Sequence, residues 1–339
     1  MAGDGNRWAI ADDAAEIAKL AARLGIQVGP ESWIARVRSQ SIFHTSQFSL
    51  LGQPFVRNGN RLGVAYLHGR PGTQGHPEFD TCYETLERRH DEIDRVQVSS
   101  VAMQELVLGT GIAETKVWLI PIGVDTDRFR LRDAASREES RRALGIPESA
   151  FVVGSFQKDG VGWGEGTEPK LIKGPDVLID VAARVAREVP ELVVLLTGPA
   201  RGFVAAGLAQ LGVAHVRAEL PDLDAVAAAY RAVDVCLVTS RDEGGPKAVL
   251  ESMATGVPLV TTRVGQAADL VSDGETGRLL DVDDSEGIAE AVVAVRNAPA
   301  AELERLAAAA RARAEACSWG MLSSRWSDLF TGFVAMERA

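Results

Sequence analysis

Residues 234–262 form the stretch of sequence that most constrains how this chain can fold. In order, the segment reads DVCLVTS, RDEGG, PKAVLESMATG and VPLVTT. Val235–Thr239 is a short apolar run of β character, and Pro246 stands where the first residue of a helix is favoured, because its missing N–H would be unpaired there. Gly256 ends the helix, and Val257–Val260 is extended around its proline. The segment therefore predicts a strand, a polar loop, a helix and a second strand.

Two carboxylates lie on this unit, Glu243 in the loop and Glu251 in the helix, with seven residues between them. The helix start offers backbone N–H groups and the positive end of the helix dipole, which together attract an anion. Glu251 lies roughly 7–8 Å further along the axis at about 1.5 Å per residue. A diphosphate at the helix start would leave one carboxylate for hydroxyl groups on each side, as in a bound nucleotide sugar. The residues expected around the anion are Gly244, Gly245, Lys247 and Ala248.

This segment resembles the E-x7-E signature of retaining GT-B glycosyltransferases, in particular the large family 4 (GT4) within glycosyltransferase group 1. The two glutamates stand between a buried strand, a Gly-Gly-Pro turn and an ATGVPLV exit, which is far more specific than their spacing alone. In that family the first glutamate contacts the donor sugar and the second contacts the ribose. The resemblance implies these roles for Glu243 and Glu251.

The resemblance also implies a GT-B architecture, an α/β fold of two Rossmann-like domains that face each other across a cleft. With 339 residues the chain is long enough for two domains, of which the first is abbreviated. We expect an acceptor-side domain over residues 1–135 and a nucleotide-sugar-binding domain over 149–316. A helix over 317–339 is expected to cross back to the first domain. The charged segment 131–149 is interpreted as the hinge.

Composition narrows the classes of function. The chain carries 36 basic and 47 acidic residues, a net charge of −11, which disfavours nucleic acid as a partner because that binding depends on neutralising phosphates. Three widely separated cysteines without metal-ligand spacing indicate buried thiols in a reducing compartment. No apolar run approaches the roughly 18 residues that span a bilayer, and the start lacks the form of a signal peptide. We expect a cytoplasmic protein, with peripheral contact at the inner membrane face if the acceptor is lipid-linked.

The first half of the chain alternates short strands with helices, which favours a parallel α/β sheet. An amphipathic helix with apolar positions from Ile10 to Leu24 opens it. No strand precedes Gly3 and Gly5, whereas GT-B enzymes normally begin with a strand, so the completeness of this sheet stays open. The strands expected next are 26–28, 41–44, 61–67, 95–98 and 116–120, with helices near 77–91 and 100–108.

One loop of this half carries candidate catalytic chemistry. His68 and Arg70 lie just beyond an apolar strand, at the carboxyl end where open α/β sheets bind ligands. The loop resembles the strand end of family 4 whose histidine lies near the donor sugar and the acceptor. We therefore interpret His68 as a residue near the reacting centre, the alternative being an ordinary surface turn. His44 has a similar place in a weaker context, whereas His90 and His215 have the character of solvated or structural residues.

The second domain begins with the strand 151–155, which contains Gly154. Family 4 members usually have an arginine after this glycine and a lysine before the next helix, and both contact the diphosphate. Lys173 matches the lysine, while Ser155 stands at the arginine position. Lys158, in the extended loop between them, is a candidate to replace the arginine. A cation here is chemically useful because negative charge builds up on the departing nucleoside diphosphate.

Two further loops complete the expected donor site. The strand 191–197 leads to Arg201, which we assign to the donor-binding set, and the family packs the base over the loop that corresponds to Leu220. The triplet Asp125–Asp127 has the form of a metal-binding D-x-D, but its place in PIGVDTDRF matches the interdomain segment of family 4. We therefore expect no bound metal, and no cofactor beyond the donor substrate.

These features predict a retaining glycosyltransferase that moves a hexosyl unit from a nucleotide-diphosphate sugar to a sugar, lipid-linked or small-molecule acceptor. Glu243, His68 and Lys173 are its catalytic candidates. No carboxylate of the first domain stands out as a covalent nucleophile, so a front-face mechanism, in which the leaving phosphate deprotonates the acceptor hydroxyl, is the natural hypothesis. Two other functions stay open. One is a GT-B nucleotide-sugar 2-epimerase, for which no acid–base set is evident, and the other is a catalytically silent nucleotide-sugar-binding subunit.

Overall fold

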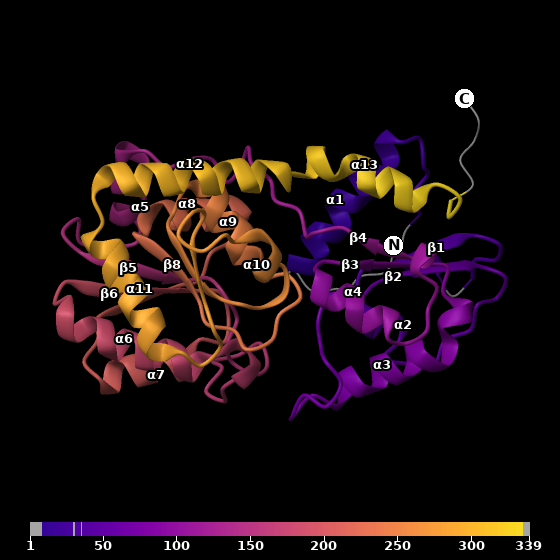
Figure 1. Cartoon of the computed structure of the whole chain (residues 1–339), viewed down its shortest axis with the longest axis horizontal. Coiled ribbons are helices and arrows are strands. Elements are labelled where there is room, and N and C mark those ends of the chain that lie inside the picture. The colour runs from indigo at the N-terminus through magenta and orange to yellow at the C-terminus, as the bar shows by residue number, and fades with distance from the viewer. Residues whose placement is uncertain (1–8, 30, 35, 335–339) are drawn as a thin grey trace. The chain divides into compact units, whose positions relative to one another are not determined.

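Parallel sheets organise both parts of the chain, as the alternation of strands and helices predicted. The computed structural model describes residues 9–29, 31–34 and 36–334. The chain divides into a first unit, residues 1–123 with 319–339, and a second unit, residues 124–318. Figure 1 shows one sheet with its covering helices in each unit.

The first unit contains a four-stranded parallel sheet in the order β1-β2-β3-β4. The prediction of a strand at 26–28 was wrong. Those residues follow the C-terminal turn of the first helix, where Ile26 N donates to Ala21 O at 3.0 Å, and most of them are exposed. The strands are β1 (Ser41–His44), β2 (Arg61–Ala65), β3 (Arg95–Val98) and β4 (Val117–Leu119).

Helices cover both faces of this sheet (Figure 1). On one face, α1 (Ala9–Arg23) and α13 (Trp319–Phe330) share an apolar cluster with Phe43 of β1, although α13 comes from the far end of the chain. On the other face lie α2 (Gln47–Leu50), α3 (Pro77–Arg89) and α4 (Val101–Leu108), with 3-10 turns η1 (Glu31–Trp33), η2 (His90–Glu92) and η3 (Glu114–Lys116) in the connections.

The second unit contains a six-stranded parallel sheet in the order β10-β9-β8-β5-β6-β7. The chain builds outward from β5 in one direction, then returns to place β8 on the other side of β5. This reversal is the topological switch point at which open α/β sheets bind ligands, beyond the carboxyl ends of the strands. The strands are β5 (Phe151–Ser155), β6 (Leu192–Thr197), β7 (His215–Ala218), β8 (Val235–Val238), β9 (Leu259–Thr262) and β10 (Arg278–Leu280).

Two apolar clusters fill the spaces between this sheet and its helices. One face is covered by α6 (Pro175–Glu188), α7 (Gly202–Gln210) and α11 (Ser285–Asn297). The other is covered by α8 (Leu223–Ala232), α9 (Lys247–Thr255), α10 (Gly265–Leu270) and α12 (Ala300–Ala316). The short turn η4 (Leu171–Lys173) precedes α6.

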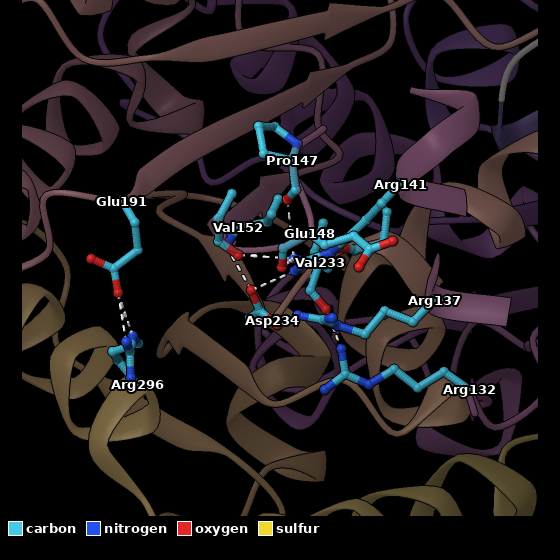
Figure 2. Close-up of polar contacts among 12 residues, drawn as sticks. Arg132, Arg137, Arg141, Pro147, Glu148, Val152, Glu191, Val233, Asp234 and Arg296 are labelled. Atoms are coloured by element: carbon cyan, nitrogen blue, oxygen red, sulfur yellow. Dashed lines mark hydrogen bonds and ion pairs between the residues drawn. The ribbon is translucent and has the colours of Figure 1, made fainter. Parts of the chain in front are cut away.

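Residues 131–149 differ from the hinge that we expected, because most of them form α5 (Ala134–Ala143), which packs on α8 within the second unit. Figure 2 shows the ionic contacts that hold α5. Asp234, just before β8, lies 2.6 Å from Arg141 Nη2 and 2.8 Å from Arg137 Nη2. It also accepts a hydrogen bond from Val152 N at 2.7 Å. The second unit begins at Val124, whereas we expected the first domain to extend to residue 135 and the second to start at residue 149.

Candidate functional site

The central ionic contact at the switch point joins Lys173 and Glu243. The Lys173 ammonium forms an ion pair with Glu243 Oε1, and their side chains are 18% and 11% exposed. Ser240 Oγ donates to the same carboxylate at 3.2 Å. Two of the three predicted catalytic residues thus meet, from loops separated by 70 positions in sequence.

Backbone contacts hold these two loops in register. Arg241 N donates to Ile172 O at 2.8 Å, and Thr239 Oγ1 donates to Gly174 O at 2.9 Å. Gly174 has a left-handed φ of 62°, and a Cβ built there would lie 2.0 Å from Thr239 O. Only glycine fits this contact without displacement, since the opposing atom is backbone. The position of Lys173 therefore depends on the glycine that follows it.

Two polar residues that our sequence reasoning missed complete this part of the site. Gln157 Nε2 donates to Lys173 O at 2.6 Å, and Ser240 Oγ lies 3.2 Å from Gln157 Oε1. Both side chains are buried. The signal that could have found them is their place just after β5 and β8, the two strands that flank the switch point.

The start of α9 faces the same loops. The helix begins at Lys247 with Pro246 as its N-cap, one position later than the sequence predicted. Gly244 O accepts from Gln266 N at 2.9 Å, and a Cβ at Gly265 would approach the carbonyls of Glu243 and Gly244 to 2.3 Å. The close packing of α10 thus fixes the loop that contains Glu243 and Gly244. The first turn of α9, with Lys247 and Ala248, presents the positive end of its dipole there.

Glu251 lies one to two turns into α9 and is 7% exposed, so it is not a surface charge. Its Oε2 accepts a hydrogen bond of 2.9 Å from the phenol of Tyr230, which is fully buried. The Tyr230 ring stacks on Phe156 with 3.7 Å between centroids, and Phe129 meets it edge-on at 5.8 Å. Burial, followed by the charge of Glu251, raises the pKa of Tyr230 well above its usual range, which keeps the phenol a donor.

The structure places three other members of the predicted donor set as follows. Lys158 is half-buried, and its ammonium lies 4.3 Å from the centroid of the Trp163 ring. Gly154 is inside β5, where a Cβ would lie 2.7 Å from Phe156 and Val233. Leu220 is partly buried against the apolar cluster on the α8 and α9 side of the sheet.

The assignment of Arg201 as a donor contact is not supported by its surroundings. The guanidinium is fully buried and lies 2.9 Å from the carboxylate of Asp159, which is also fully buried. It donates to Ser155 O, Ser155 Oγ and Thr197 O, each at 2.9 Å. Burial lowers the pKa of Arg201, against the opposing effect of Asp159. Arg201 is therefore part of the scaffold beneath the loops.

His68 belongs to the first unit and follows β2. Its ring lies 5.5 Å from Phe48 and 5.5 Å from Phe79, and its carbonyl accepts from Gln47 Nε2. His44 is buried beside Ser49, with its Nδ1 3.1 Å from Ser49 Oγ, and burial lowers its pKa to about 4. His44 is therefore a neutral core residue, and His68 is the more accessible histidine of the two.

The described residues contain no group of three or more His, Cys, Asp or Glu side chains that could hold a metal ion. In the predicted D-x-D, Asp125 Oδ1 instead accepts from Asp127 N and Arg128 N, each at 3.1 Å. Cys82, Cys236 and Cys317 are buried thiols, as predicted. Within the same described ranges, every helix is too short or too polar to cross a membrane.

Comparison of the sequence with known proteins places this site in a family context. Residues 166–297 match the family described as "Glycosyl transferases group 1". The D-inositol 3-phosphate glycosyltransferase of Thermomonospora curvata is 33% identical over 248 residues, which cover 68% of this chain and 54% of that protein. The protein of the same description from Saccharomonospora viridis is 33% identical over 269 residues, or 73% and 57% of the two chains. The chain thus spans little more than half the length of these relatives.

Solved structures share the fold seen here. Anabaena HepE in complex with UDP-glucose aligns with a TM-score of 0.79 at 18% identity and covers 98% of each chain. The sucrose-phosphate synthase of Thermosynechococcus elongatus aligns with a TM-score of 0.67 at 21% identity, over 86% of this chain and 72% of that one. At these sequence identities the similarity shows a shared fold and no more.

Proposed function

We propose that this protein transfers a hexosyl unit from a nucleotide-diphosphate sugar to an acceptor hydroxyl, because residues 166–297 match the group 1 glycosyltransferases and the two α/β units have the GT-B fold. The proposal includes retention of configuration at the anomeric carbon and no requirement for a metal. The donor would bind to the second unit at the switch point between β5 and β8.

The observation that carries the proposal is the ion pair between Lys173 and Glu243 at the start of α9. A cation and a helix dipole together suit the diphosphate, and a carboxylate that is 11% exposed suits the hydroxyl groups of a sugar. Glu251, further along the same helix, would accept from the ribose hydroxyls. Donor binding would then transfer Lys173 from Glu243 to the phosphate oxygens.

The proposed reaction needs few groups from the protein. The bond from the anomeric carbon to the phosphate oxygen breaks, and a bond to the acceptor oxygen forms on the same face of the sugar. The acceptor proton passes to the leaving phosphate oxygen. Lys173, Lys158 and the dipole of α9 would stabilise the charge on the departing diphosphate, which is the role preorganised cations and dipoles have in catalysis. His68 would lie on the acceptor side.

UDP-sugars are the first donors to test, because HepE was solved with UDP-glucose and with UDP and glucose. Thermal unfolding would be followed with UDP, GDP, ADP and TDP and their common sugars, first without metal and then with Mg²⁺. A ligand at about 100 times its dissociation constant stabilises the folded state by about 2.7 kcal/mol. A metal-independent shift with one base is expected. The absence of a shift with every nucleotide would overturn the proposed donor site.

Two measurements separate transfer from the other functions of this fold. Incubation of the stabilising nucleotide sugar with candidate acceptors, followed by NMR of the anomeric proton, is expected to show a product with the configuration of the donor. Conversion to a 2-epimer instead would indicate an epimerase. For an enzyme, Lys173→Ala lowers turnover at saturating donor, whereas a silent binding subunit would show only weaker binding.

A further inference from the structure

Residues 157–170 lie in the loop between β5 and η4 and make many contacts. We call this segment the β5 arm. Its two sides pair with each other: Gly160 bridges Pro169, and Val161 N donates to Glu168 O at 2.9 Å. At its base Lys170 N donates to Asp159 O at 2.7 Å. The arm is therefore a hairpin, not an irregular insertion.

The tip of the β5 arm is fixed on α7. Gly202 N and Phe203 N, in the first turn of that helix, donate to Glu165 O at 2.7 Å and to Gly166 O at 2.9 Å. Gly166 has a φ of 70°, and a Cβ there would lie 2.4 Å from Ala200. The arm thus occupies the amino end of α7, so that end is closed to a ligand.

The base of the arm is fixed by Asp159 and Arg201, whose charged groups lie 2.9 Å apart with both side chains fully buried. Arg201 also binds both oxygens of Ser155 at the end of β5. A buried ion pair contributes little net stability because desolvation offsets its attraction, but it holds its partners in one geometry. Here the pair ties the residue after Lys158 to the end of the sheet.

Lys158 lies between two anchored residues. Gln157 on one side binds the carbonyl of Lys173, and Asp159 on the other side binds Arg201. The Lys158 ammonium lies 4.3 Å from the centre of the Trp163 ring, whose side chain is 53% exposed. Burial, followed by the Lys173 charge, lowers the pKa of Lys158.

The loops that carry Lys158 and Lys173 meet where Gln157 Nε2 donates to Lys173 O, and cations on adjoining loops favour an anion between them. Glu243 pairs with Lys173. We propose that the β5 arm is a preformed phosphate-binding arm, in which Trp163 and the Asp159–Arg201 pair are positioning residues that hold Lys158 for the terminal phosphate of the donor diphosphate. This inference rests on the proposed function of the same site and adds the residues that replace the missing arginine.

The test uses a series of ligands that differ in phosphate number. Uridine, UMP and UDP would be titrated by calorimetry into the full chain, or the matching series of the base that stabilises it. Lys158→Ala is expected to weaken UDP binding about tenfold or more, which corresponds to the loss of one charged hydrogen bond, and to leave uridine binding unchanged. Lys19→Ala, an exposed lysine of α1, is the control for loss of one charge and should leave UDP binding unchanged.

Two substitutions of Trp163 test whether this residue positions Lys158 or only supports the fold. Its side chain is exposed, so both variants should fold. Trp163→Phe keeps an aromatic face and should bind UDP nearly as wild type does. Trp163→Leu should weaken UDP about two- to fivefold, which is the value of an exposed cation–π contact. Asp159→Asn should weaken UDP without affecting uridine, and Trp163 provides the test if that variant fails to fold.

The outcomes separate the inference from the function on which it rests. Two results would contradict the phosphate-binding arm without contradicting the proposed donor site. One is that the wild-type protein and Lys158→Ala bind UDP equally well. The other is that Lys158→Ala weakens uridine binding as much as UDP binding. Equal UDP binding by Trp163→Phe and Trp163→Leu would remove Trp163 from the positioning residues. If wild type binds no nucleoside diphosphate, both proposals fail together.

Discussion

The phenol of Tyr230 donates a hydrogen bond of 2.9 Å to Glu251 Oε2 inside the second unit. Tyr230 is fully buried and its ring lies on Phe156, so the bond holds the Glu251 carboxylate in a single orientation. A carboxylate with 7% exposure needs such a partner, because an unpaired charge in this position would lose its hydration without compensation. The proposed ribose contact is therefore oriented by α8, the helix that carries Tyr230.

Tyr230→Phe tests this orientation with the ring packing left intact. We expect the free energy of unfolding to fall by about 1–2 kcal/mol, because a buried acceptor loses its donor. Urea denaturation measures this change. Tyr83→Phe, at a partly exposed tyrosine of α3, is the matched control and should change stability little. Equal effects of the two substitutions would show that the hydrogen bond to Glu251 does not contribute to the free energy of unfolding.

The ion pair between Lys173 and Glu243 predicts a coupled loss of activity. Lys173→Ala should lower turnover about 100-fold, the usual effect of removing a group that stabilises transition-state charge. Glu243→Gln should also lower turnover, because it removes the ionic partner of Lys173 and the proposed sugar contact. The double variant should lose much less than the product of the two single effects, because each residue positions the other. Turnover would be measured with the donor that stabilises the protein. Strict additivity would contradict the coupling.

Gly174 and Gly212 form a matched pair, since both have left-handed φ values, 62° and 68°. A Cβ at Gly212 meets nothing within 4 Å, whereas one at Gly174 would lie 2.0 Å from Thr239 O. Gly212→Ala should therefore cost only the backbone strain of about 1–2 kcal/mol. Gly174→Ala should cost clearly more and weaken nucleoside diphosphate binding. Calorimetric melting and titration measure both, and similar losses at the two glycines would contradict the tight contact.

Replacement of Asp234 is expected to lower the free energy of unfolding strongly. Asp234→Asn leaves the fully buried guanidinium of Arg141 without its carboxylate, and breaking a buried pair costs about 3–5 kcal/mol. Asp224→Asn removes an ion pair with Arg128 in which Asp224 is 81% exposed, and such pairs contribute about 0–1 kcal/mol. Guanidinium denaturation should rank the two variants in this order.

His44 predicts a loss of stability in mild acid. Burial lowers its folded-state pKa to about 4, while an unfolded histidine titrates near 6.5. Between these values the unfolded chain binds one proton more, so this contribution is complete above pH 6.5 and is lost as the pH falls towards 4. The change amounts to about 3 kcal/mol. His44→Gln should flatten the difference in unfolding free energy between pH 7 and pH 5, and an unchanged slope would contradict the assignment.

The sequence of the second unit determined most of its local structure. Apolar runs with β character, helix-ending glycines and the spacing of Glu243 and Glu251 are local properties. For this reason β8, α9 and β9 appear in the predicted order and close to the predicted positions. Lys173 was identified by its match to the family 4 lysine, which stands before a glycine and a proline that open a helix. In the first unit the same patterns predicted four of the strands, and failed at 26–28, where a short apolar run is only the end of a helical turn.

Only the tertiary structure decided which polar residues turn inward. Arg201 has the same local signature as a ligand-binding arginine at a strand end, yet Asp159 neutralises it in the interior, 42 positions away. Tyr230, Gln157 and Ser240 gain their places through partners on other strands and helices. Residues 131–149 likewise have the composition of a linker, and Asp234 makes them part of the second unit. Local sequence determines helices and strands through backbone preference and hydrophobic period, whereas burial of charge depends on a compensating charge that only the folded chain brings near.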